Sequence, residues 1–462
     1  MNKGLMLDII KNNKYLILIY TIAMASFVVN LDTYVVNVSL PIMVTQFNTT
    51  TTAISWVALS YNLIVVSLLL TFGKLGDKVG LKRLFIIGFI VFSIGSLLCG
   101  IAYNLGLLIF SRFVQGIGAS ILYALPQAII AKYIPKEQRG MAFGILASAA
   151  ALGITLGAPV SGLISGLFSW RLIFFINIPI GIFSIIFLTY VLPKDIFSYT
   201  NKKPFDYIGA FLSFIFALSF TLYINQGNNF GWNSILMWGL LFVFVIFFSL
   251  FVVRINTFKF PLLNPKFFTN LNFDLANIAM LFLSILLSGT NFIMPFFLNG
   301  IKGLDVTYIG FVVMVYSISY MISSIISGKL SKLYQPKTIS IIAMFIALCN
   351  IILFSCLLKF DSILPSLIFL VLCGVSFSFF ITSNNNYVMS MSNKSNAGMV
   401  AGTHRMVGRF GMLLGVVFFE AILVNVNNID KFISYYVTFL LSGVFALISL
   451  VCCVMLKSND KL

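Results

Sequence analysis

Charge is the property that this sequence has least of. Only 9% of its 462 residues are charged, while 60% are hydrophobic. A soluble globular domain carries roughly 25% charged residues, and a water-soluble fold of this length could not bury so much apolar surface. The composition therefore excludes a soluble protein before any motif is considered.

Residues that carry catalysis or bind metals are also scarce. The chain has one histidine and six cysteines, and the cysteines lie inside apolar stretches without the spacing of a metal site. No glycine-rich phosphate-binding loop and no paired set of catalytic groups is present in the sequence. We therefore expect no enzymatic activity, no cofactor and no bound metal.

Long apolar runs fill most of the chain instead. A helix that crosses a bilayer needs about 20 mostly apolar residues, because the hydrocarbon core is ~30 Å thick and each residue rises ~1.5 Å. The runs predict fourteen spans, at residues 15–40, 53–72, 84–103, 105–131, 140–165, 171–192, 207–224, 234–253, 273–298, 306–328, 338–358, 364–389, 397–423 and 434–456.

The basic residues lie mainly in every second loop. With both termini on one side, that side receives 22 of the 29 lysines and arginines, the other side receives four, and three lie inside spans. Since basic loops remain in the cytoplasm, both termini are expected there, in a multi-pass protein of the cell membrane. This topology explains the net charge of +17 without nucleic acid. The low charge and the abundance of Ile, Phe and Asn favour a bacterial source.

A glycine-rich basic segment runs from Gly73 to Arg83, between spans 2 and 3. Glycine permits a tight turn, and Asp77 can accept hydrogen bonds from a helix N-terminus or a basic side chain. The tripeptide Gly-Lys-Leu that starts this segment recurs at Gly328, 255 residues later. The repeat favours two six-helix halves, although the segment alone could be an ordinary basic loop.

Two charged residues are expected deep inside the first half. Asp32 lies eight residues from the outer end of span 1, and Arg112 lies seven residues below the outer start of span 4, so both are ~10–12 Å deep. A buried arginine needs a partner, and Asp32 is the only carboxylate predicted at that depth. We predict an Asp32–Arg112 couple, shared by Gln115, which is either made and broken by protonation or a permanent structural pair.

Span 5 is rich in small residues around a proline: Gly153, Gly157, Pro159 and Gly162. Small residues let helices pack closely in a membrane, and proline interrupts the hydrogen-bond ladder. The pattern predicts a bendable helix, which could be part of the transport mechanism or an ordinary kinked helix.

Span 13 contains Arg405 and Arg409, which lie four residues apart and so share one helix face. An arginine at this depth must face a partner or a water-filled cavity. Two interpretations stay open: packing against carbonyls and polar side chains, or an anion-binding role in a substrate cavity. The residues that we expect in this cavity are Asp32, Tyr34, Gln115, Asn385, Arg405 and Arg409.

Four other titratable residues are expected to have structural rather than functional roles. Asp206, Asp274 and Glu420 lie near predicted span ends, where a solvated or helix-capping carboxylate is usual. His404, the one histidine, is expected to be hydrogen-bonded rather than to relay protons.

These motifs resemble the signatures of the major facilitator superfamily, and in particular its fourteen-helix drug:proton antiporter branch, which includes multidrug and antiseptic efflux proteins. The resemblance rests on the Gly73–Arg83 loop, the segment from Leu31 to Pro41, the run that begins at Arg112, and the span-5 motif, and it becomes thinner in the second half. Two departures are visible: Lys332 stands where the second copy of Asp77 would map, and Ala158 separates Gly157 from Pro159.

The resemblance implies an all-α integral membrane fold with two six-helix bundles and two accessory helices. The expected domains are residues 1–195, 196–260 and 261–462. By the same resemblance, Asp32 and Arg112 would couple transport to protons, and Asp77 would help to latch the outward-facing state. The implied latch residues are Gly73, Asp77, Gly80 and Arg83, and the implied antiporter motif is Gly153, Gly157, Pro159 and Gly162.

The sequence thus predicts a proton-coupled exporter of small amphiphilic molecules that works by alternating access. Its expected partners are substrate, protons and membrane lipids, without nucleic acid, and a monomer is the expected state. Carboxylates are few beyond Asp32, which favours a zwitterionic, neutral or anionic substrate over a cation. The alternatives are an exporter or flippase of a specific anionic, zwitterionic or lipid-like metabolite, an importer, and a non-transporting receptor or scaffold.

Overall fold

The computed structural model describes residues 3–135, 138–191, 206–258, 261, 270–331, 333–391, 397–426 and 431–457. Its secondary structure in these ranges is entirely helical, and fourteen helical segments are long and apolar enough to cross a membrane. The predicted all-α fold and the predicted number of spans are therefore confirmed.

Sixteen helices account for the fourteen spans. They are α1 (Lys3–Gln46), α2 (Thr51–Val79), α3 (Leu81–Gly100), α4 (Leu105–Ala124), α5 (Pro126–Tyr133), α6 (Arg139–Leu167), α7 (Leu172–Phe175), α8 (Asn177–Val191), α9 (Tyr207–Phe230), α10 (Ile235–Thr257), α11 (Leu271–Gly300), α12 (Val306–Leu330), α13 (Pro336–Leu357), α14 (Leu364–Ser390), α15 (Ala397–Val426) and α16 (Lys431–Met455).

Two predicted spans are each divided into two helices. Span 4 consists of α4 and α5, and Pro126 is the first residue of α5. Span 6 consists of α7 and α8, and Pro179 lies in the first turn of α8. Proline has no N–H to donate and fits best in the first turn of a helix, so both prolines mark a new helix start.

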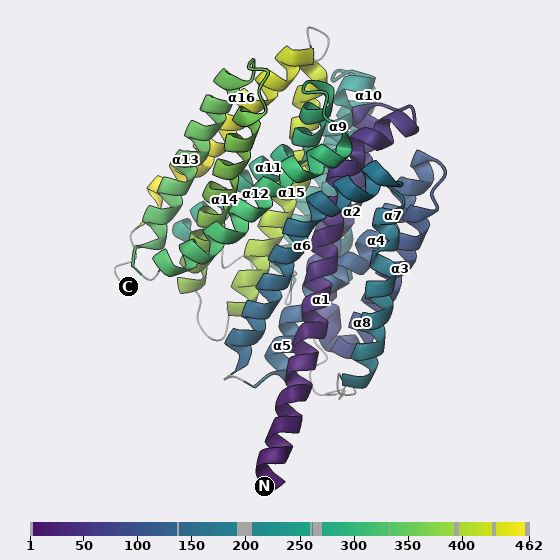
Figure 1. Cartoon of the computed structure of the whole chain (residues 1–462), viewed down its shortest axis with the longest axis vertical. Helices are drawn as coiled ribbons and strands as arrows, with labels where there is room; N and C mark the ends of the chain where they lie inside the picture. Colours follow the sequence, from purple (N-terminus) through teal and green to yellow (C-terminus); the bar gives the residue numbers. More distant parts are fainter. Residues whose placement is uncertain are drawn as a thin grey trace.

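The helices form two groups, which Figure 1 shows as a purple-to-blue set and a green-to-yellow set. We call α1 to α8 the N-terminal bundle and α11 to α16 the C-terminal bundle. The basic face is the end of the molecule that carries the chain's N-terminus, the α2–α3 connection at Gly80 and the start of α6 at Arg139. The far face is the opposite end, where α1 connects to α2 and α11 connects to α12.

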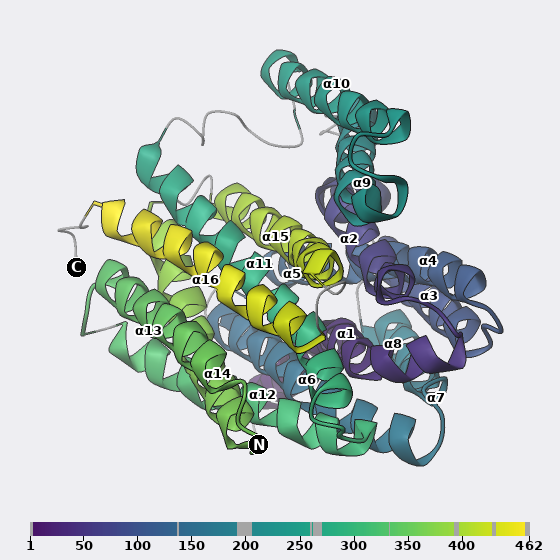
Figure 2. The ribbon, with the colours of Figure 1, turned by 90° about the horizontal axis from the view of Figure 1, so that it is seen from above.

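The two remaining helices lie outside the bundles. Helix α9 packs against α2 and against α15, and so contacts both bundles, whereas α10 packs mainly on α9. Seen from above, α10 stands apart from the rest of the molecule (Figure 2). The predicted domain boundaries at residues 195 and 260 lie outside the described residues.

Helix α6 owes its position to the small residues of span 5. A Cβ at Gly157 would lie 2.6 Å from Cβ of Tyr34 on α1, and a Cβ at Gly162 would lie 2.8 Å from Cα of Gly310 on α12. The Thr307 hydroxyl donates a 3.2 Å hydrogen bond to the Gly162 carbonyl. Glycine therefore lets α6 pack closely on both sides, and the contact with α12 joins the two bundles in their far-face halves.

The close contact at Gly162 predicts the effect of a larger side chain. We expect Gly162→Leu to force α6 and α12 apart, because its Cβ would meet backbone atoms of residues 306, 307 and 310 within 3.0 Å and backbone cannot rotate away. Hydrogen–deuterium exchange in peptides from the far-face halves of α6 and α12 should become faster.

The matched control is Gly144→Leu, at an exposed position of the same helix where a Cβ would meet nothing within 4 Å. Equal exchange in the two variants would contradict the role assigned to Gly162.

Candidate functional site

An ion pair is buried inside the N-terminal bundle. The Nη1 atom of Arg112, on α4, lies 2.6 Å from Oδ2 of Asp32, on α1, and each side chain is only 1% exposed. The depth arithmetic on the sequence predicted this contact. Burial of both charges makes each one depend on the other, because an isolated ion in this environment is costly.

Neutral groups form the remaining hydrogen bonds to Asp32 and Arg112. The second carboxylate oxygen of Asp32 accepts hydrogen bonds from Gln115 Nε2 at 2.8 Å and from Asn177 Nδ2 at 2.9 Å. Arg112 donates from Nη1 to Gln115 Oε1 at 2.6 Å and from Nε to the Val57 carbonyl at 2.9 Å. Helices α1, α2, α4 and α8 thus converge on one polar network.

Three members of this network, Ser96, Tyr61 and Asn177, were not predicted from the sequence. Ser96, on α3, accepts hydrogen bonds from Gln115 Nε2 at 2.8 Å and from Asn177 Nδ2 at 3.3 Å. The guanidinium carbon of Arg112 lies 4.2 Å from the ring centroid of Tyr61, a cation–π distance. Asn177 had a detectable signal, since it is an amide inside an apolar run, whereas Ser96 is one of many serines in the spans.

A cavity of about 580 Å³ lies between the bundles. Its walls come from the basic-face halves of the helices, including Gln127 of α5, Phe143 of α6 and Asn385 of α14. The far-face halves are closed by the α6–α12 contact and by packing of α2 on α15. The cavity is therefore on the side of the basic face.

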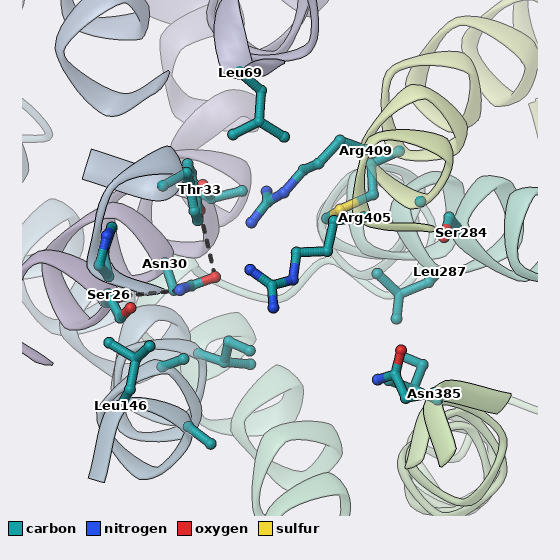
Figure 3. A pocket seen from close by; sticks show the side chains of 18 of the residues that line it. Ser26, Asn30, Thr33, Leu69, Leu146, Ser284, Leu287, Asn385, Arg405 and Arg409 are labelled. Carbon is teal, nitrogen blue, oxygen red and sulfur yellow. Dashed lines mark hydrogen bonds between the residues drawn. The ribbon is translucent and has the colours of Figure 1, made fainter. Parts of the chain in front are cut away.

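Both arginines of α15 point into this cavity (Figure 3). Arg409 is directed toward Thr33 of α1, and Arg405 toward Asn30. The guanidinium carbon of Arg409 also lies 3.8 Å from the ring centroid of Tyr123 on α4, so this contact crosses from one bundle to the other. The structure thus places Arg405 and Arg409 in the cavity wall, together with Tyr34 and Asn385.

Asp32 and Gln115 do not lie where the sequence analysis expected them. They are 2% and 0% exposed and are absent from the cavity wall. Their side chains point into the N-terminal bundle because Arg112 and Asn177 supply their hydrogen bonds there. The pair is nevertheless adjacent to the cavity, since the residue that follows Asp32, Thr33, lines it.

The connection between α2 and α3 is shorter than the predicted loop. Residues 73–79 belong to α2, and the turn is made by Gly80 alone, with φ of 104°. This is a conformation that only glycine adopts without strain. Arg83 is exposed on α3, and the side chain of Asp77 lies outside what the structure describes, so the latch role stays a prediction.

A second polar cluster joins three parts of the molecule near the far face. Glu420, on α15, is 1% exposed and accepts hydrogen bonds from the Thr52 hydroxyl of α2 and from Asn225 Nδ2 of α9, the latter at 3.0 Å. Asn225 also donates to Ser55 Oγ at 3.2 Å and accepts from Trp56 Nε1 at 2.7 Å. The solvated or capping role expected for Glu420 is therefore wrong, because α2 and α9 cover it.

Among the other titratable residues, Asp206 and His404 agree with expectation, whereas Asp274 is half-buried in the first turn of α11 and its Oδ1 has no hydrogen-bond partner among the described residues. Asp206 caps α9 by accepting from Gly209 N at 2.9 Å, and it pairs with Arg254 Nε at 2.9 Å, so its capping role is confirmed. His404 Nδ1 is hydrogen-bonded to Asn277 Oδ1 at 2.9 Å, as predicted.

The buried ion pair leads to a prediction on stability. Arg112→Met should lower the free energy of unfolding by ~3–5 kcal/mol, because it leaves the Asp32 carboxylate buried without its counter-ion. The double variant Asp32→Asn/Arg112→Met should recover much of that loss, and Lys359→Met, in an exposed loop, should change little. Thermal unfolding in detergent compares the four proteins. A double variant no more stable than Arg112→Met would contradict the electrostatic explanation.

The Glu420 cluster leads to a second prediction. Glu420→Ala removes the acceptor of two buried donors, at a cost of ~1–3 kcal/mol for each unsatisfied group, whereas Glu420→Gln keeps one acceptor and should cost less. Hydrogen exchange should speed up at the start of α2 and around Asn225 in α9. Asp361→Ala, at an exposed loop carboxylate, is the control, and the same exchange in all three variants would show that the cluster does not hold the helices together.

Comparison with known proteins gives the family. The sequence profile of the Major Facilitator Superfamily matches residues 22–416 and 276–461. The chain is 33% identical over 409 residues to the riboflavin transporter RibZ of Clostridioides difficile (strain 630), with 88% of each chain covered. It is 31% identical over 385 residues to multidrug resistance protein 3 of Bacillus subtilis (strain 168), with 80% of this chain and 72% of the relative covered.

Solved structures agree at the level of the fold. The nucleoside transporter NupG superposes with a TM-score of 0.67 at 14% identity, with 95% of this chain and 99% of that chain covered. A bacterial homologue of the human lysosomal transporter Spinster, in an inward-facing and occupied conformation, gives 0.66 at 12% identity, with 95% and 96% covered. Together with the profile match and the fourteen helices, these similarities establish that the chain belongs to the major facilitator superfamily and is a membrane transporter rather than an enzyme.

Proposed function

We propose that this transporter is a proton-coupled exporter of small amphiphilic molecules in the bacterial cell membrane, and that it works by alternating access. The observation that carries the proposal is the buried Asp32–Arg112 pair directly behind the wall of a cavity between two bundles. A membrane-embedded carboxylate of this kind is costly and points to a function such as proton transfer.

Protonation of Asp32 would change the forces inside the N-terminal bundle. A neutral Asp32 no longer attracts Arg112, so the arginine is left to Gln115 Oε1, the Val57 carbonyl and the Tyr61 ring. Thr33 and Tyr34 follow Asp32 on α1 and line the cavity, so a shift of α1 would alter the substrate site. Proton and substrate would then influence one another through a single helix.

The orientation of the cavity in the membrane is inferred from the distribution of charge. The cavity is on the side of the basic face, and basic loops remain in the cytoplasm. In this arrangement the substrate would enter from the cytoplasm, and a proton entering from outside would drive the return. The name of the Bacillus subtilis relative, multidrug resistance protein 3, supports export.

A second candidate is a carrier of one specific metabolite. It is favoured by the name of RibZ, a riboflavin transporter, and by two arginines in the cavity wall, which a broad cation exporter does not need. An importer is disfavoured by the Gly153–Gly162 motif, and a non-transporting receptor by the intact buried pair. Phospholipids of the inner leaflet remain candidate substrates within this alternative.

Proton coupling can be tested in liposomes that contain a pH-sensitive dye. With a cationic dye, riboflavin or an anionic amphiphile supplied on one side, we expect the transported compound to trigger proton movement in the opposite direction. Asp32→Asn should abolish the proton movement, because it has no titrating group, whereas Asp361→Asn should retain it. Transport that proceeds equally in both variants without proton movement would exclude Asp32 as the coupling residue.

A further inference from the structure

We propose that Arg405 and Arg409 form a binding subsite for the negatively charged end of the substrate, so that this transporter carries anionic amphiphiles. The ligand class is a carboxylate or phosphate ester attached to an apolar body. The inference rests on the proposed function only in taking the cavity between the bundles as the substrate cavity.

The charge of the cavity wall is the first argument. Its described lining contains two arginines and no aspartate, glutamate, lysine or histidine. The two ion pairs found among the described residues involve Arg112 and Arg254, so neither arginine of α15 has a carboxylate within 4 Å there. Guanidinium groups inside a membrane protein are costly unless an anion or water meets them. A bound anion supplies that counter-charge.

The geometry of the two arginines is the second argument. They are one helical turn apart on α15, and both side chains extend into the same space (Figure 3). A guanidinium presents a planar fork of N–H donors that matches the oxygens of carboxylate and phosphate. Two such forks on one helix face can hold a single anionic group between them. Placement of two like charges side by side also costs repulsion, which an anion between them would relieve.

Arg409 and Arg405 differ in their contacts, and we therefore assign them different roles in anion binding. Arg409 lies against the Tyr123 ring at 3.8 Å, and the Tyr123 hydroxyl donates to Asn30 Oδ1 at 3.4 Å. Asn30 is in turn held by a 2.7 Å hydrogen bond from Nδ2 to the Ser26 carbonyl. Arg409 is therefore positioned across the cavity by the N-terminal bundle. Arg405 is exposed to the cavity and is free to meet the incoming anion first.

The opposite wall accounts for the apolar part of the ligand. Helix α6 contributes Leu146, Ala147, Ala150 and Ile154 to the cavity, and these residues provide an apolar surface without charge. Figure 3 shows Leu146 across the cavity from both guanidinium groups. A ligand could place its anionic group at the arginines of α15 and pack its apolar body against α6. An amphiphile can form both interactions, whereas a simple inorganic anion can form only the first.

The test uses fluorescent ligands that share one body and differ in charge. Dansylaminoundecanoic acid, its methyl ester and the amine 11-(dansylamino)undecylamine, which has the same chain length, are titrated onto the full-length protein in phosphatidylcholine nanodiscs, with empty nanodiscs as background. We expect the acid to bind about tenfold more tightly than the ester, since hydrogen bonds to charged groups are among the stronger ones, and the amine to bind most weakly.

Substitutions assign this preference to the two arginines. Arg405→Gln and Arg409→Gln should each reduce the ratio of acid to ester affinity, and the double variant should bring it to about one, with ester binding unchanged. Retained ester binding shows that the variants are folded. Lys359→Gln, which removes a charge from an exposed loop, should keep the full preference. An equal affinity for acid and ester in the wild type, or a preference that survives in the double variant, would overturn the proposal.

Two further comparisons complete the test. One distinguishes a lipid headgroup from a dissolved anion as the natural ligand, and the other distinguishes failure of anion binding from failure of proton coupling. Displacement of the acid by phosphatidylglycerol in the nanodisc would identify a lipid headgroup as the natural ligand, whereas displacement by dissolved phenyl phosphate alone would identify a free solute. The acid preference is measured at equilibrium without a pH gradient, so it is a separate result from the proton movement in liposomes. Failure of proton coupling would therefore leave this result intact.

Discussion

A charge in the membrane interior must be met by another group, and this constraint governs the polar sites of the transporter. The structure meets it in three ways. Asp32 has a cation and two amides inside one bundle. Glu420 has two neutral donors, Thr52 and Asn225, at the junction of three parts of the molecule. The arginines of α15 face a cavity, where water or a ligand can meet them.

Polar contacts within one bundle and polar contacts between the two bundles respond differently when the bundles move relative to one another. Contacts inside a rigid bundle persist when the bundles rock, so the Asp32 network does not by itself distinguish the two faces of transport. Contacts between the far-face halves of the bundles must break when the far face opens, and the Gly162–Gly310 approach and the Glu420 cluster are of this kind. The proposed proton coupling therefore requires α1, which carries both Asp32 and the cavity residue Thr33, to transmit a change in the Asp32 network to the contacts between the bundles.

The sequence allowed prediction of features that depend on spacing along one helix. Apolar run lengths and a constant rise per residue were enough for the fourteen spans and for the equal depths of Asp32 and Arg112, and the need of a buried arginine for a counter-ion then identified them as a pair. Features that depend on the packing of particular helices against one another could not be predicted from the sequence. A carboxylate near a span end faces water or protein according to its neighbours, and Glu420 is buried because α9 and α2, distant in sequence, cover it. Likewise, the hydropathy pattern could not show that Gly80 alone makes the α2–α3 turn.

The same reasoning explains what the two extra helices add to a two-bundle transporter. Helix α9 contacts α2 of one bundle and α15 of the other, and its Asn225 links Ser55 to Glu420 across them. When the far face opens, α9 can follow only one bundle, so Asn225 must give up either Ser55 and Trp56 or Glu420. Helix α2 forms two neutral hydrogen bonds with Asn225, whereas α15 offers it one carboxylate acceptor. A bond to a carboxylate is about as strong as two neutral ones, so α9 is held to both bundles and resists their separation at the far face.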